Sequence, residues 1–116
     1  MNPDQKVIEA IFKTLLVENA QRYQQALSQP TNDDRDVYGL ARNALASLNK
    51  HDKEAVLKFL NLAIADSASL ILGTLDGSCF PEGINGDFVV SYDGSEVQGD
   101  LQDLFIEKAE RAGIYG

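Results

Sequence analysis

The stretch from Asp52 to Leu75 constrains the fold most, because it has the pattern of one long helix. It begins amphipathic, with apolar residues at the three-and-four spacing of a single helix face. From Leu62 onward it is apolar on nearly every side, and small residues such as Ala68 would let a neighbouring helix approach closely. A helix that is apolar all round is usually buried, so we expect this one to be the central and most enclosed element. Asp66 interrupts its apolar half without a base nearby, and its side chain is expected to face solvent.

Two further helices are expected before it. Asn2, Pro3 and Gln5 form a helix start: an N-cap, a proline at the first helical position, and an amide that can complete a capping box. A stripe of apolar residues with helical spacing follows. The residues from Thr31 to Asp34 supply caps and acids for a second helix, whose apolar stripe runs from Val37 to Leu48.

The second half of the chain predicts a hairpin and a last helix. Residues 76–87, DGSCFPEGINGD, have the composition of a loop between a helix exit and a strand. β-Branched and aromatic residues then flank Asp93-Gly94, a pair suited to a type I′ turn. A final helix starts at Gly99-Asp100 and ends near Gly113, with Ile114 folding back behind it. We therefore expect one α+β domain over residues 1–116, with three N-terminal helices, a short antiparallel β-hairpin and a C-terminal helix, as a single layer of helices packed on a small sheet.

The composition points to a cytoplasmic protein. Cys79 is the only cysteine, so the chain cannot form an internal disulfide. The N-terminus lacks the basic region and apolar run of a signal peptide. The longest mainly apolar stretch, Val56 to Leu75, carries lysine, asparagine, aspartate and serine, and is too polar for a membrane span of about 20 residues. No membrane partner is expected, and the oligomeric state stays open.

The charge of the chain is unevenly distributed. The net charge is -8, yet the segment from Phe59 to Glu107 contains nine acids and no lysine or arginine. All of the excess negative charge therefore lies in this segment. Such a surface repels phosphate backbones and attracts basic proteins, so we expect a basic protein partner and no nucleic acid.

The common metal and thiol sites fail on spacing or on missing partners. An EF-hand loop begun at Asp76 would need an oxygen ligand and a glycine where Phe80 and Pro81 stand. The Cys79 thiol has no base in its local sequence that would stabilise a thiolate. His51 fits an ordinary position in a turn between helices, and one histidine with one cysteine cannot make a conventional zinc site. The sequence predicts no catalytic residue, no metal site and no cofactor.

Paired carboxylates leave one enzymatic alternative. A small metal-assisted hydrolase could use Asp87, Asp93 or Asp100. Such chemistry also needs basic or tyrosine side chains around the substrate, and bases are missing from this segment. Asp100 and Asp103 are more simply explained as first-turn acids that stabilise the start of the last helix.

The acidic segment is also a candidate docking face. Charges attract and orient a basic partner, and aromatic side chains among them can serve as anchors. The candidate partner-binding residues are Glu82, Asp87, Tyr92, Asp93, Glu96, Asp100 and Asp103. Solubility alone is the alternative explanation of these charges.

The run from Val56 to Glu107, with LDGSCFPEGINGDF and GDLQDLFIE, resembles small uncharacterised bacterial α+β proteins of the toxin-immunity type. The resemblance implies a helical front, a short sheet and a final helix, and it carries no catalytic residue across. It also implies binding as the activity, since immunity proteins of this kind commonly bind their toxin through acidic surfaces. We therefore expect a non-enzymatic protein that neutralises a basic toxin. The alternative within the same class is an acidic inhibitor that mimics nucleic acid and binds a DNA-handling protein.

Overall fold

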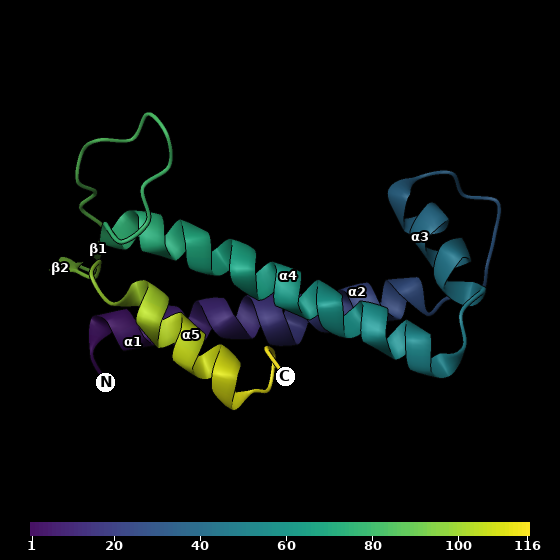
Figure 1. The fold of residues 1–116 in the computed structure, drawn as a ribbon. Coiled ribbons are helices and arrows are strands. Elements are labelled where there is room, and N and C mark those ends of the chain that lie inside the picture. The colour runs from purple at the N-terminus through teal and green to yellow at the C-terminus, as the bar shows by residue number, and fades with distance from the viewer.

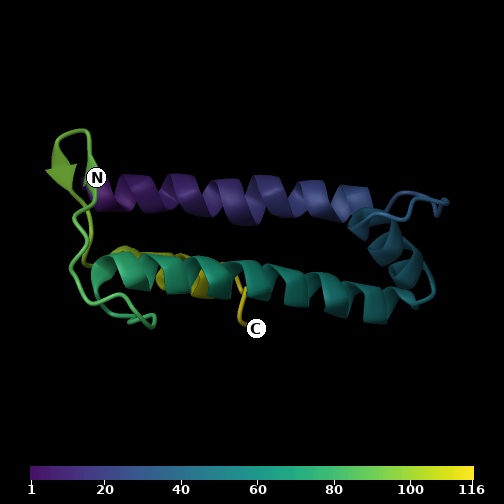
Figure 2. The ribbon, with the colours of Figure 1, turned by 90° about the horizontal axis from the view of Figure 1, so that it is seen from above.

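The computed structural model describes the whole chain from Met1 to Gly116 as an elongated, helix-rich molecule. Two long helical rods run side by side, a shorter helix lies beneath them near one end, and another helix closes the opposite end (Figures 1 and 2). The elements, in chain order, are α1 (Pro3–Phe12), η1 (Lys13–Asn19), α2 (Ala20–Leu27), α3 (Val37–Ala46), α4 (Lys50–Asp76), β1 (Ser91–Tyr92), β2 (Ser95–Glu96) and α5 (Leu101–Arg111).

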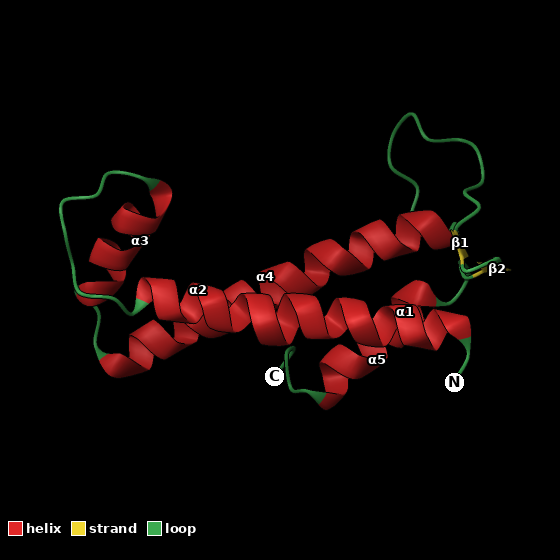
Figure 3. Cartoon of the chain, turned by 180° about the vertical axis from the view of Figure 1, so that it is seen from behind, coloured by secondary structure: helices red, strands yellow, loops and turns green.

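The first rod is one continuous helix made of α1, η1 and α2 (Figure 3). It begins as the sequence predicts, with the Asn2 backbone N–H donating to Gln5 Oε1 at 3.2 Å and Pro3 in the first turn. Its middle turns, η1, are π-helical. Since a π turn keeps the backbone hydrogen-bonded, no turn residue in the sequence marks it.

The second helix, α3, starts later than the sequence suggested. Its N-cap is Asp36, whose carboxylate accepts from the Gly39 N–H at 2.8 Å, so the caps expected within Thr31 to Asp34 are wrong. α3 is tied to the first rod by Arg42, whose Nε donates to the Ala26 carbonyl at 2.9 Å.

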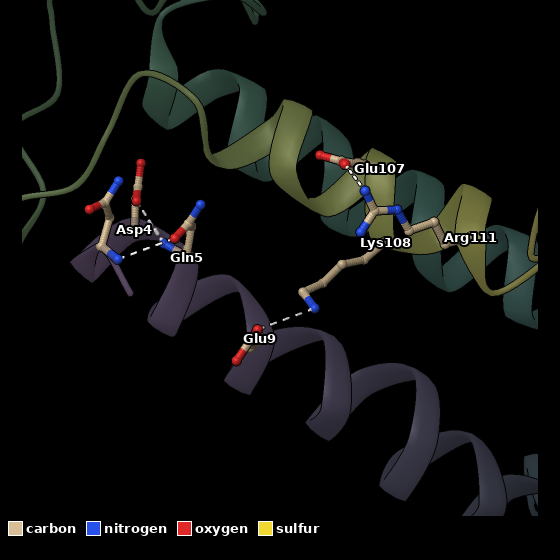
Figure 4. A network of polar contacts seen from close by, with 7 residues as sticks. Asp4, Gln5, Glu9, Glu107, Lys108 and Arg111 are labelled. Carbon is tan, nitrogen blue, oxygen red and sulfur yellow. Dashed lines mark hydrogen bonds and ion pairs between the residues drawn. The ribbon is translucent and has the colours of Figure 1, made fainter.

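The core sits at one end of the molecule, where α5 packs against both rods. Phe105 of α5 is completely buried and meets Phe12 edge to face, with ring centroids 5.7 Å apart. At the rim of this contact, Lys108 Nζ of α5 lies 3.7 Å from Glu9 Oε1 of α1 (Figure 4). The buried members of the core cluster are Ile8, Leu16, Ala65, Ala68, Leu72, Val97, Leu101 and Phe105.

α4 is not the most enclosed element, and that expectation is wrong. Only 22% of its most apolar 18-residue window is buried. Phe59, Leu70 and Ile71 each expose more than three-fifths of their surface, whereas Ala65 and Leu72, on the side facing α5, are buried. By length and composition alone α4 could span a membrane, so the expectation that Val56 to Leu75 is too polar for a span does not hold by this test, which core helices of soluble proteins also pass. Asp66 is exposed, as expected.

The hairpin forms at the predicted turn but is very small. Asp93 and Gly94 take positive φ angles of 51° and 81°, as a type I′ turn requires. Each strand has two residues, both exposed, so the helices pack on one another rather than as a layer on a sheet. Val97 is buried beside the partly buried Val90 and donates its N–H to the Val90 carbonyl at 2.9 Å. The α+β class therefore holds in its coarse form, with helices dominating.

Candidate partner-binding site

The candidate residues gather at one end of the molecule, which we call the acidic end and define as residues 76–103. The loop after α4, the hairpin and the start of α5 come together there, beside the start of α1 (Figure 1). The acidic end holds seven carboxylates and no lysine or arginine. The fold thus brings most of the negative charge of residues 59–107 together at one end of the molecule.

Asp76, the last residue of α4, holds this end together. Its Oδ1 accepts from the Gly99 N–H at 2.6 Å and the Leu101 N–H at 3.2 Å, and its Oδ2 accepts from the Gln102 N–H at 2.8 Å. These are the free N–H groups at the start of α5, which a helix normally satisfies with its own N-cap side chain. Asp100 stands at the N-cap position but makes no such bond. Asp76 therefore caps α5 from another helix.

A second polar cluster fixes the loop that follows. The Ser78 hydroxyl donates to Gln102 Oε1 at 2.9 Å, and Gln102 Nε2 reaches the Ser69 carbonyl at 3.1 Å and the Cys79 Sγ at 3.5 Å. A Cβ atom at Gly73 would lie 2.5 Å from that sulfur, closer than real Cβ contacts come. The cysteine and its neighbours thus serve to seat the loop on α4 and α5, in agreement with a connecting loop.

The structure leaves the predicted binding residues accessible. Glu82, Asp87, Tyr92, Asp93, Glu96, Asp100 and Asp103 are all exposed. The two ion pairs of the molecule, Lys108–Glu9 and Arg111–Glu107, involve none of them. Lys6 of α1 lies over the Tyr92 ring, with its Nζ 5.7 Å from the ring centre. Six carboxylates at this end are therefore free of cationic partners within the chain.

The alternative of a metal-assisted hydrolase needs side chains that could hold a metal ion. Nowhere in the structure do three histidine, cysteine, aspartate or glutamate side chains group so that they could hold a metal ion. Asp87, Asp93 and Asp100 belong to no such group, and each is exposed on the surface.

A second feature, which no sequence pattern predicts directly, is an apolar groove between the two rods. The groove has a volume of about 880 Å³ and is lined by 16 residues, 14 of them hydrophobic, from the first rod, α3 and α4. At the α3 end of the groove, the ring centroids of Tyr23 and Tyr38 lie 6.3 Å apart. The signal that could have revealed the groove is the second apolar face of α4, which one core cannot cover.

Near the C-terminus, the phenol of Tyr115 has a raised pKa. Partial burial raises the pKa of its phenol above the usual 10.0, and the negative charges of Asp66 and Glu110 raise this pKa further. Each of these effects disfavours a phenolate, so the group remains neutral at physiological pH.

Searches of protein-family models, of curated proteins and of solved structures find no match for this chain.

Proposed function

We propose that the protein is a non-enzymatic binding protein of the toxin-immunity type, which neutralises a basic protein by docking its acidic end against it. The observation that carries the proposal is the clustering of six exposed and unpaired carboxylates at one end of an elongated molecule. The mechanism is occlusion of the partner's working surface, and it requires no chemistry from this chain.

The electrostatics favour a protein with a basic surface over other partners. Like charges concentrated on one end repel phosphate groups and speed the encounter with a positive surface. Tyr92, 42% exposed among these charges, supplies an aromatic anchor of the kind that carries much of the binding energy at protein interfaces. Gln102 fixes the base of the loop after α4 at Ser78, and Asp76 fixes the start of α5, so binding orders little additional backbone at these two places.

Two matched sets of charge reversals test the proposal. The first set, Glu96→Lys, Asp100→Lys and Asp103→Lys, changes three exposed acids of the hairpin and of the start of α5. The control set, Glu18→Lys, Asp33→Lys and Glu54→Lys, changes three exposed acids elsewhere. Both sets alter the net charge of the chain equally, so that only the place of the change differs.

The probe is the purified product of the gene that neighbours the one for this chain, and affinity is measured by isothermal titration calorimetry at low and moderate salt. We expect the first set to weaken binding by at least about a hundredfold and the control set by less than about tenfold. Equal losses for the two sets would show that net charge alone matters. Either that result or a lack of binding by the unaltered protein overturns the proposal.

A further inference from the structure

The molecule exposes far more surface than a compact chain of its mass. Its accessible surface is 7964 Å², whereas a compact monomer of 12.7 kDa exposes about 6,200 Å². Its radius of gyration is 17.2 Å, against about 13 Å expected for this length. The excess is about 1,700 Å² per chain, or about 3,400 Å² for two chains, which lies within the range that obligate homodimers bury.

Part of the exposed apolar surface lies on α4, where Phe59, Leu70 and Ile71 each expose more than three-fifths of their surface. Along the rim of the groove, α4 carries a strip of exposed or half-exposed residues spaced alternately four and three apart, as in the seam of two packed helices, and three of these residues also line the groove. The seam consists of Val56, Leu60, Ala63, Ser67, Leu70 and Thr74.

The seam is symmetric about position 65, near the middle of the helix. Ala63 and Ser67 stand at equal distances on either side of this position, as do Leu60 and Leu70. Two antiparallel copies of α4 would therefore meet with small residues at the crossing point and leucines opposite leucines. A twofold interface requires this self-complementarity of one patch, whereas an unrelated partner does not.

The charges along the helix favour the same arrangement. Lys50 and Lys53 lie at the start of α4, and the loop after its end carries Glu82 and Asp87 without any base. Antiparallel pairing places the lysines of each copy beside the acidic loop of the other. A lipid surface fits less well, because anionic headgroups repel a chain with a net charge of -8.

We propose that the occupant of this apolar face is a second copy of the chain, and that the protein is a twofold symmetric dimer in which the two α4 helices pack antiparallel across Ala63 and Ser67. The hairpins and the starts of the two α5 helices, which carry most of the acidic end, remain available for a partner. The dimer stands independently of the proposed function.

The first test is the mass in solution, measured by sedimentation equilibrium from about 1 to 100 µM. The unaltered chain is expected at twice 12.7 kDa. Leu70→Glu, at a seam side chain 61% exposed in the single chain, should weaken dimerisation at least about a hundredfold while far-UV circular dichroism retains its helical signal. The matched control is Val89→Glu in the loop, where the side chain is 68% exposed, and it should leave the dimer intact.

The second test fixes the orientation of the helices with cysteines in a Cys79→Ser background. A mixture of Leu60→Cys and Leu70→Cys proteins should form a mixed disulfide, since the two positions face each other across the twofold axis. Leu60→Cys alone should stay uncrosslinked, because its two copies would be about 15 Å apart along the helices.

A monomer at every concentration overturns the proposal, and flotation of that monomer with neutral phosphatidylcholine vesicles would assign the face to a membrane instead. Rapid crosslinking of Leu60→Cys alone overturns the antiparallel arrangement.

Discussion

Removing the Asp76 carboxylate should destabilise the fold by about 2 kcal/mol. Capping side chains are worth about 1 kcal/mol. The Asp76→Ala change also strands the half-buried N–H groups of Leu101 and Gln102, and unpartnered donors in such positions cost about 1 kcal/mol more. Asp76→Asn keeps one acceptor oxygen and should cost about half as much.

The assay is urea unfolding followed by far-UV circular dichroism at one fixed protein concentration, because dimerisation links stability to concentration. With a slope of about 1.5 kcal/mol per molar urea, the midpoint of Asp76→Ala should fall by about 1.3 M at unchanged slope. The control is Asp100→Ala, at the formal N-cap position where the side chain makes no capping bond, and its cost should stay below about 0.5 kcal/mol. A larger loss for Asp100→Ala than for Asp76→Ala would refute capping from α4.

Substitutions at Gly73 and near Tyr115 test the packing at the end of α4 and the electrostatics at the C-terminus. Gly73→Ala should lower the free energy of unfolding by about 1–3 kcal/mol, because the added methyl meets the Cys79 sulfur, whereas Gly86→Ala, which has open space around it, should change little in the same urea assay. The raised pKa of Tyr115 means that the folded chain keeps the phenol proton above pH 10, where the unfolded chain releases it, so its contribution to stability is lost as pH rises through the folded pKa. Asp66→Asn should lower the pKa of Tyr115 in an ultraviolet absorbance titration referenced to Tyr115→Phe, and an unchanged pKa would contradict this electrostatic coupling.

Local features of the fold follow from the sequence because their causes are local. The Asp93-Gly94 pair predicts the hairpin turn through its readiness for positive φ, and the structure shows both angles. Gly113 predicts the end of α5, where the Ile114 N–H returns to the Ala109 carbonyl at 3.0 Å.

Features that depend on distant residues do not follow from the sequence. Asp76 caps a helix that begins 25 positions later, and no local pattern marks that relation. The prediction that α4 is the most enclosed helix was wrong for a different reason. An all-round apolar helix indicates that both faces will be covered, but its pattern does not reveal whether the chain itself or a second molecule supplies the cover.

The sequence predicts which residues make the candidate site acidic, but it does not predict how these residues are arranged in space. The absence of bases from residues 59–107 identifies the acidic surface directly. The sequence does not show that Glu82, Asp93 and Asp103 lie at the same end, because the bonds that join the end of α4 to the start of α5, made by Gln102 and Asp76, connect residues far apart in the chain.

The measurement that tests the central claim most directly is chemical-shift mapping of the isotope-labelled protein as the basic partner is added. We predict that the largest backbone amide shifts fall in residues 82–103 and that raising the salt concentration reverses them. Shifts concentrated instead in α2 and α3, with those residues unmoved, would contradict the account.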